Sequence, residues 1–228
     1  MSSKKKFKKQ EKKIPNVKLA LVGDSGVGKS SIIGRYVSGM FLDNCQSTTG
    51  PSFSKKLYEK HGKSICLNIW DTVGQEKYRA IGKNFYKDAY IICLVFDITQ
   101  KQSFENIKEV WYPDIKKHGE KYIILSIIGN KCDKVEDENV DEKEVTSFAE
   151  EIGALCFLVS ALNGDKIDSL FDTLAENYLS SELKNKNDQK NSARSRSESF
   201  ELDVETIKKT NKKKRKSCWS VYIIKVYI

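Results

Sequence analysis

Four short apolar runs, each bounded by turn residues, recur along the chain. They are VKLALV at residues 17–22, YIICLVFDI at 90–98, YIILSIIG at 122–129 and LCFLVS at 155–160. Runs that are apolar at nearly every position are typical of strands buried on both faces of a parallel sheet. We therefore predict four central parallel strands.

Segments with the apolar spacing of amphipathic helices follow these strands. They are SIIGRYV at 31–37, SFENIKEVWYPDI at 103–115, DEKEVTSFAEEIG at 141–153 and KIDSLFDTLAENYL at 166–179. Strands that alternate with helices indicate an α/β fold built around a doubly wound sheet. The pattern predicts helices on both faces of that sheet.

One further region alternates polar and apolar residues instead. Residues 52–59 and 64–70 flank a His-Gly pair, a pattern that predicts a hairpin and one antiparallel strand at a sheet edge. The expected fold is α/β, with a mixed six-stranded sheet, mostly parallel with one antiparallel edge strand, flanked by about five helices.

Charge divides the 228 residues into three parts. The net charge is +9, yet residues 1–13 carry +6 and residues 184–228 carry +8, which leaves the body mildly acidic. We predict a flexible basic lead-in at 1–16, one domain at 17–181 and a largely disordered basic tail at 182–228. A nucleic-acid-binding protein that uses the tails is an alternative. Since few aromatic residues lie between the basic ones, we expect no nucleic-acid partner.

The apolar segments and the cysteines indicate in which cellular compartment the chain is found. No apolar run approaches the ~18 residues of a membrane span, and no hydrophobic stretch follows the Lys-rich N-terminus, so we expect a cytoplasmic chain. No C-x-x-C spacing occurs, which favours reduced packing cysteines over metal ligands. The six are Cys45, Cys66, Cys93, Cys132, Cys156 and Cys218.

The sequence GDSGVGKS at 23–30 fits G-x-x-x-x-G-K-[ST] and lies between a predicted strand and a predicted helix. Glycines let such a loop curl so that backbone N–H groups face an anion, and the helix dipole adds positive charge. Lys29 would reach the β and γ phosphates, and the Ser30 hydroxyl would bind Mg²⁺. An ordinary Gly-rich turn is the alternative. The predicted contacts are Ser25, Gly26, Val27, Gly28, Lys29, Ser30 and Ser31.

The motif NKCD follows the third apolar strand directly, at a strand end where doubly wound folds bind ligands. Asp133 can accept hydrogen bonds from the N1–H and the exocyclic amine that guanine has and adenine lacks. Asn130 and Lys131 complete the predicted base site. A polar turn is the alternative for these four residues taken alone.

A third motif, WDTVGQE at 70–76, follows the second strand of the hairpin. Asp71 could hold Mg²⁺ through water, and the Gly74 N–H could approach a γ-phosphate. Gln75 could orient an attacking water. Asp71 and Thr72 could instead cap a helix start.

These motifs, with Ser160-Ala-Leu162 after the last strand, resemble the Ras-like small GTPases, and GDSGVGKS, WDTVGQE and NKCD together are most similar to the Rab branch. The resemblance covers about residues 14–181. It implies that Thr48 closes on Mg²⁺ and the γ-phosphate and that Phe41 stacks on guanine. The Ala161 N–H would bind the base carbonyl, with Ser160 and Leu162 beside it.

The resemblance further implies a monomeric GTP/GDP switch that hydrolyses GTP slowly and regulates vesicle traffic. Lys29, Thr48 and Gln75 would serve catalysis, while Ser30, Thr48 and Asp71 would hold Mg²⁺. Effectors, an exchange factor and a GTPase-activating protein would bind residues 41–53 and 71–86. A GTP-binding scaffold that does not cycle, or a Ras-like GTPase outside vesicle traffic, is the alternative.

Some positions depart from the family pattern. Thr49 stands where the family usually has Ile, and Pro51 removes one backbone donor from the effector-facing segment. Val73 replaces an Ala and stiffens its loop, and Leu162 replaces a Lys beside the base. The segment STTGPSF at 47–53 is similar to endosomal Rabs, which implies peripheral association with endomembranes of endosomal type.

The basic segment KKTNKKKRKSC at 208–218 resembles the stretch that precedes lipidated cysteines in Rab proteins, but ten residues, WSVYIIKVYI, follow Cys218. This C-terminal end could be a read-through or splice form, or the apolar end could lie in a bilayer interface beside the basic cluster. A solvated charge run is the third alternative. The basic tail is expected to meet an anionic membrane surface.

Overall fold

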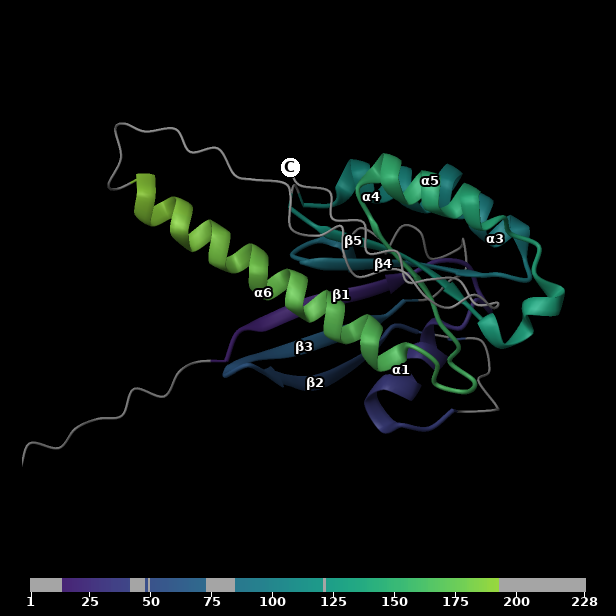
Figure 1. Cartoon of the computed structure of the whole chain (residues 1–228), viewed down its shortest axis with the longest axis horizontal. Helices are drawn as coiled ribbons and strands as arrows, with labels where there is room; N and C mark the ends of the chain where they lie inside the picture. Colours follow the sequence, from purple (N-terminus) through teal and green to yellow (C-terminus); the bar gives the residue numbers. More distant parts are fainter. Residues whose placement is uncertain (1–13, 42–47, 49, 73–84, 121, 193–228) are drawn as a thin grey trace, which may run out of the picture.

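The computed structural model describes residues 14–41, 48, 50–72, 85–120 and 122–192, with side chains described up to residue 183. Within them a single sheet runs through the molecule, and helices lie on both of its faces (Figure 1).

Six strands form this sheet, in the spatial order β2-β3-β1-β4-β5-β6. The β2–β3 pair is antiparallel, and all other neighbouring pairs are parallel. The predicted mixed sheet with an antiparallel edge strand is therefore confirmed. The strands are β1 (Asn16–Val22), β2 (Ser52–Lys60), β3 (Lys63–Asp71), β4 (Ile91–Asp97), β5 (Ile124–Asn130) and β6 (Leu155–Leu158).

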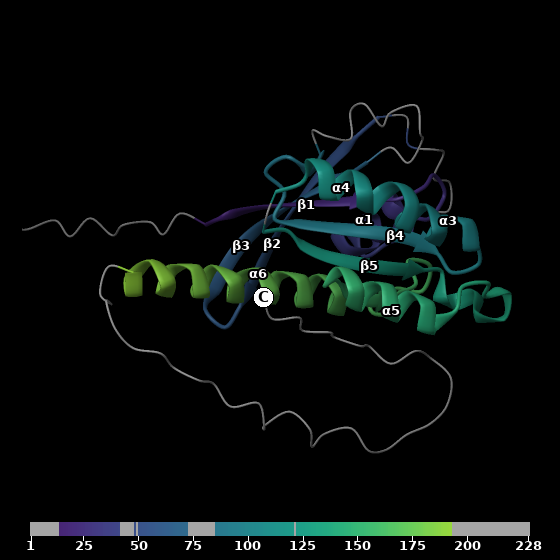
Figure 2. The ribbon, with the colours of Figure 1, turned by 90° about the horizontal axis from the view of Figure 1, so that it is seen from above.

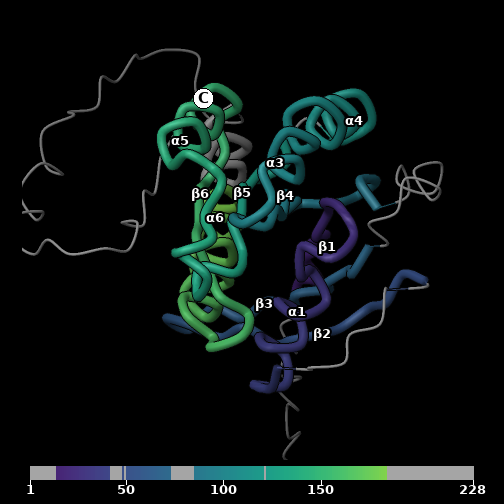
Figure 3. Tube along the Cα trace, turned by 90° about the vertical axis from the view of Figure 1, so that its right-hand side faces the viewer, coloured from purple at the N-terminus to yellow at the C-terminus, as the bar shows by residue number. Residues whose placement is uncertain are grey.

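Two apolar clusters fill the space between the sheet and its helices. The first includes side chains of α1 and α6, and the second includes side chains of α3, α4 and α5. In Figure 1, α3, α4 and α5 lie together above the sheet, and Figure 3 shows α1 beside β2 and β3. The helices are α1 (Lys29–Ser38), α3 (Lys101–Asn106), α4 (Tyr112–His118), α5 (Glu142–Ile152) and α6 (Ile167–Ser192).

The burial of each strand follows its place in the sheet. Every residue of the central β4 is buried, whereas the edge strand β2 buries only Tyr58. A central parallel strand is covered by helices on both faces, and an edge strand is not. The continuous apolar run of β4 and the more polar sequence of β2 reflect this difference.

The region predicted as one helix at 103–115 is divided in the structure. A five-residue π-helical turn, η2 (Ile107–Trp111), separates α3 from α4, and Pro113 lies in the first turn of α4. Proline has no N–H to continue an α-helical ladder, and a π turn inserts one extra residue into it. The apolar spacing alone did not reveal this interruption.

The last helix, α6, extends to Ser192, past residue 181 where the sequence predicts the domain to end. Figure 2 shows α6 running along the sheet and continuing beyond its strands. The domain boundaries themselves stay predictions. None of the helices among the described residues combines the length and apolar character that a membrane crossing requires.

None of the described cysteines forms a disulfide. Cys93, Cys132 and Cys156 are buried, and Cys66 is partly buried. Burial raises the pKa of both Cys93 and Cys156 to about 12. Thiols of this kind are inert packing groups, as predicted. Cys45 and Cys218 lie outside the described residues.

Candidate nucleotide-binding site

The carboxyl ends of four parallel strands bring the predicted motifs to one edge of the sheet. The loop after β1 begins at Gly23, β3 ends at Asp71, and β5 ends at Asn130, which pairs with Asp97 of β4. Leu21 of β1 is the register partner of Asp71. Ligands of doubly wound folds bind at such an edge.

Two glycines of the loop at 23–28 occupy positions that exclude a side chain. At Gly23 (φ +143°) a Cβ would lie 2.1 Å from the Val95 carbonyl oxygen, and at Gly28 (φ +96°) it would lie 2.2 Å from Nδ2 of Asn130. Gly26 instead faces open space, with nothing within 4 Å of a Cβ position. The loop is therefore packed at both ends and open in the middle, which suits an anion cradled by backbone N–H groups.

Lys29 opens α1 and is only 5% exposed. Its ammonium group donates to the carbonyl oxygens of Gly23 at 2.8 Å and Asp24 at 2.7 Å. Burial lowers the pKa of Lys29 to about 8, although the charges of Asp71 and Asp24 act in the opposite direction. A phosphate group beside the amine would favour its charged form again.

Ser30, Thr48 and Asp71 meet in one cluster. The Ser30 hydroxyl lies 2.9 Å from the Thr48 hydroxyl and donates to Oδ2 of Asp71 at 2.5 Å. Burial raises the pKa of Asp71, although the Ser30 hydrogen bond and the Lys29 charge oppose the rise. Oδ1 of Asp71 is buried with no hydrogen-bond partner.

That unpaired carboxylate oxygen and the two hydroxyl oxygens fit Mg²⁺, which prefers oxygen ligands and is usually held by only one or two carboxylates. Elsewhere in the described chain, no three His, Cys, Asp or Glu side chains gather into a metal site. Ser30, Thr48 and Asp71 are residues that could hold the ion.

Thr72 has a structural role that the sequence did not suggest. Its hydroxyl is buried and donates to the Leu21 carbonyl oxygen at 2.7 Å. The bond ties the end of β3 to β1, because these two strands are neighbours in the sheet. The cluster around Asp71 is thereby held against the loop at 23–28.

Asn130 connects the two halves of the site. It is 2% exposed, its Nδ2 donates to the Val27 carbonyl at 2.9 Å, and its Oδ1 accepts from the Ala161 N–H at 3.1 Å. The amide therefore joins the loop at 23–28 to the loop that contains Ser160 and Ala161.

The other residues of NKCD are fixed by neighbours as well. Lys131 adopts a left-handed φ of +68°, and its ammonium lies 2.6 Å from Oδ2 of Asp97. Asp133 is exposed, and its Oδ1 accepts a hydrogen bond from the Ser160 hydroxyl. A carboxylate anchored through one oxygen can present its remaining lone pairs to a ring N–H and an amine.

Several predicted residues stand at the margin of this arrangement or outside it. Phe41 is partly buried and packs against the first apolar cluster, and Leu162 is 48% exposed. Ser25 and Gly26 are exposed, and Ser31 lies in the first turn of α1. Thr49, Val73, Gly74 and Gln75 lie outside the described residues, so their predicted roles stay predictions.

Sequence reasoning missed the contacts that support the loop from α3 and η2. Nδ2 of Asn106 donates to one oxygen of Asp24 at 2.6 Å, and the indole N–H of Trp111 donates to the other at 2.8 Å. The backbone oxygen of Asp24 also accepts from Lys29. In the sequence Trp111 appears as one more apolar residue of a helical pattern, so no signal distinguished it.

A comparison with protein families decides the identity. The model of the Ras family matches residues 18–180, most of the chain. The chain belongs to the Ras family. Within the family it is a Rab-type small GTPase, as its relatives indicate, and such GTPases hydrolyse GTP and bind guanine nucleotides.

Three relatives illustrate the degree of similarity. Ras-related protein Rab11A of Lotus japonicus is 38% identical over 157 residues, which cover 69% of each chain. GTP-binding protein ypt2 of Schizosaccharomyces pombe is 35% identical over 78% of this chain and 88% of the relative. Ras-related protein Rab-31 of Rattus norvegicus is 38% identical over 71% of this chain and 83% of the relative.

Proposed function

We propose that this Rab-type GTPase is a GTP/GDP switch that works with Mg²⁺ and regulates vesicle traffic. One observation carries the proposal. The phosphate loop, the cluster of Ser30, Thr48 and Asp71, and the NKCD motif lie along one sheet edge, and Asn130 of that motif is hydrogen-bonded to the phosphate loop. This arrangement supports a site that reads phosphates, metal and base together.

The chemistry required of the chain is positioning and charge stabilisation around an in-line water. Lys29 would place its charge on the β and γ phosphates, and Asp133 would read guanine. Mg²⁺, when held by Ser30, Thr48 and Asp71, supplies charge neutralisation at the phosphate oxygens. Gln75 would orient water, with intrinsic turnover of roughly 10⁻⁴ to 10⁻³ per second.

Binding of effectors through residues 41–53 and 71–86 is supported by aromatic side chains at their borders. Phe53 is 45% exposed, and its ring lies 5.1 Å from that of Trp70, which in turn lies 6.1 Å from Phe85. The ammonium of Lys18 stands 5.3 Å from the Trp70 ring. Aromatic side chains such as the exposed Phe53 are enriched in protein interfaces.

Attachment to membranes is proposed for the basic tail. Seven basic residues and no acidic ones lie between Lys208 and Lys216, and each contributes roughly 1 kcal/mol near an anionic leaflet. We propose peripheral association with endomembranes of endosomal type, through this segment together with Cys218 or the apolar end. The GTPase itself is proposed to be monomeric.

Binding and single-turnover hydrolysis by the purified chain test the switch. We expect GTP and GDP to bind far more tightly than ATP and ADP, and bound GTP to be hydrolysed slowly in the presence of Mg²⁺. Binding without any hydrolysis would support a non-cycling scaffold. Equal affinity for guanine and adenine nucleotides would contradict the proposed base site.

A further inference from the structure

Arg35 of α1 contacts two separate loops at once. Its Nε donates to the Ala161 carbonyl oxygen at 2.9 Å, and Nη2 donates to the Leu162 carbonyl. Its Nη1 donates to the Gly39 carbonyl at 2.9 Å. A guanidinium carries its N–H donors in a rigid plane, so one side chain can hold three carbonyl groups in a fixed arrangement.

Both of these loops adjoin residues assigned to the guanine site. Ala161 is held on its N–H side by Asn130 and on its carbonyl side by Arg35. Gly39 caps the end of α1 and stands two residues before Phe41. The aliphatic part of Arg35 also passes beside Gly164, where a Cβ would lie 3.5 Å from Cδ of the arginine.

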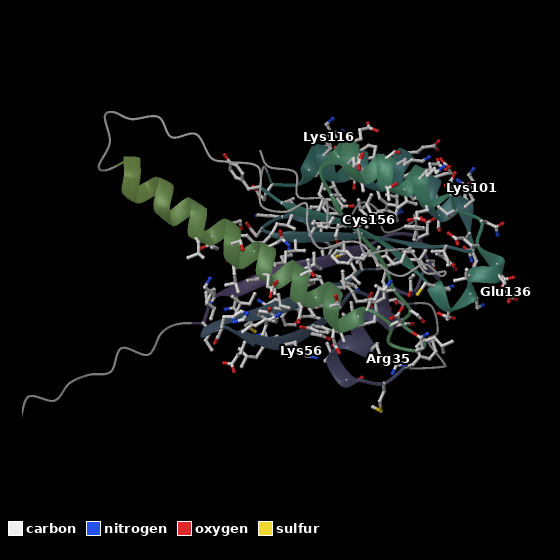
Figure 4. All side chains as sticks on the ribbon, in the orientation of Figure 1. Arg35, Lys56, Lys101, Lys116, Glu136 and Cys156 are labelled. Carbon is white, nitrogen blue, oxygen red and sulfur yellow. The ribbon has the colours of Figure 1, made fainter. Side chains whose placement is uncertain are left out.

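The same helix begins at the phosphate side of the site. Lys29 and Ser30 are the first two residues of α1, and Arg35 lies in its last turn. Arg35 therefore links α1 directly to the loop at 160–162, in addition to the link that Asn130 makes. In Figure 4, Arg35 lies on α1, far from Lys116, which lies on α4.

We propose that Arg35 is a positioning residue for guanine recognition. It fixes the Ser160–Leu162 loop and the Gly39 turn on α1, so that the base site and the phosphate helix act as one rigid unit. The inference rests on the guanine site of the proposed function. Without Arg35 the loop at 160–162 is free to move, and bound nucleotide leaves sooner because its base contacts open more often.

Two substitutions and a control test the inference. Arg35→Met keeps the aliphatic stem and removes all three hydrogen bonds, whereas Arg35→Lys keeps the charge without the planar fork. Lys116→Met removes one positive charge from an exposed site on α4. GDP dissociation is followed by chasing fluorescent GDP with excess GDP, and the affinities for GDP and ADP are compared in each variant.

We expect GDP to leave Arg35→Met about ten-fold faster than the wild type or more, with a smaller preference for GDP over ADP. Arg35→Lys should fall between the two, and Lys116→Met should match the wild type. A loss of general stability alone would not change the preference between the two bases, so this ratio reports on the base site.

Two results would overturn the inference. One is dissociation from Arg35→Met within two-fold of Lys116→Met, and the other is faster dissociation with an unchanged preference for GDP over ADP. If Arg35→Met does not fold by circular dichroism, Arg35→Lys decides between the same outcomes. A wild-type chain that binds no guanine nucleotide would instead refute the proposed function.

Discussion

The two halves of the nucleotide site differ in how far the chain alone satisfies its polar groups. On the base side, Asn130 bonds through both ends of its amide, and Asp133 is anchored by Ser160. On the phosphate side, Oδ1 of Asp71 is buried without a partner, and burial lowers the pKa of Lys29. The base half is preorganised by internal hydrogen bonds, whereas the phosphate half holds charges that a ligand would stabilise.

This difference teaches where the free energy of binding arises. A buried carboxylate oxygen without a partner and a desolvated ammonium are costly for the protein alone, so phosphate and Mg²⁺ would relieve that cost when they bind. Because internal hydrogen bonds already order the base half, binding of a base costs little conformational entropy there. The fixed hydrogen-bonding groups can therefore discriminate between bases. Substitutions in the base half should therefore change the preference between bases, whereas substitutions in the phosphate half should change the dependence on phosphates and Mg²⁺.

The largest effect is expected at the base half, from Asp133→Asn. The substitution replaces the two carboxylate acceptors of Asp133 with an amide that no longer matches the two donors of guanine. GTP affinity should therefore fall by about 10³-fold or more while affinity for xanthosine triphosphate rises. Titration with both nucleotides measures the exchange. Asp137→Asn, an exposed acid of the same short helix (Cys132–Asp137), is the matched control. Unchanged GTP affinity in Asp133→Asn would remove Asp133 from base recognition.

At the phosphate half, Ser30→Asn should disturb the metal cluster and leave the base contacts alone. We expect affinity for GTP to fall about 10²-fold at millimolar Mg²⁺ and affinity for GDP to fall less, because the γ-phosphate depends most on the ion. Competition binding over a range of Mg²⁺ concentrations measures both. Ser38→Ala, at the other end of α1, is the control. Equal losses for GTP and GDP would contradict the assigned metal site.

Gln75→Leu should separate binding from turnover on the phosphate half. The predicted role of Gln75 begins only when water attacks, so intrinsic hydrolysis should slow about ten-fold with binding intact. Single-turnover release of phosphate from preloaded protein measures the rate. Unchanged hydrolysis would exclude Gln75 from the intrinsic mechanism, although an activating protein could still accelerate the reaction with its own residues.

The smallest effect follows from the lowered pKa of Lys29. Below pH 8 the amine is already charged in the free protein, but above pH 8 it is neutral and must take up a proton when phosphates bind. Affinity for GDP should therefore fall with rising pH, by less than ten-fold between pH 8 and 9.

Calorimetry at pH 8.5 in buffers of different ionisation enthalpy measures this proton uptake. Lys29→Met, which has no titrating amine, is the control and should show none of the uptake that belongs to this group. A wild-type chain that binds GDP at pH 8.5 without taking up a proton would contradict the role given to Lys29.

The fold could be predicted from the sequence because its signals are local. The apolar runs that became β1 and β4 to β6, and the alternating hairpin, each record which faces are covered. The strand ends then fixed where the motifs meet, since parallel strands share one carboxyl edge. The structure brings Lys29, Ser30, Asp71 and Asn130 to that edge for the same reason.

The supporting contacts could not be predicted, because they depend on pairs far apart in the sequence. Arg35 on an amphipathic helix has the pattern of a solvent-facing residue, yet it bonds to Ala161. Trp111, which bonds to Asp24, is the last residue of the π turn, and no periodicity encodes where the extra residue of that turn is inserted. Such contacts become visible only when the helices are placed on the sheet.

The hydrogen bond between Trp111 and Asp24 also gives the chain an intrinsic optical reporter. The indole is 6% exposed and donates to the carboxylate of the loop residue whose backbone oxygen holds Lys29. Indole emission depends on the charge and hydrogen bonding around the ring, so filling the phosphate loop should change the fluorescence of Trp111. With Trp70 and Trp219 replaced by Phe, Trp111 is the one tryptophan left in the chain, and occupancy of the loop could be followed in real time on unlabelled protein and unmodified nucleotide.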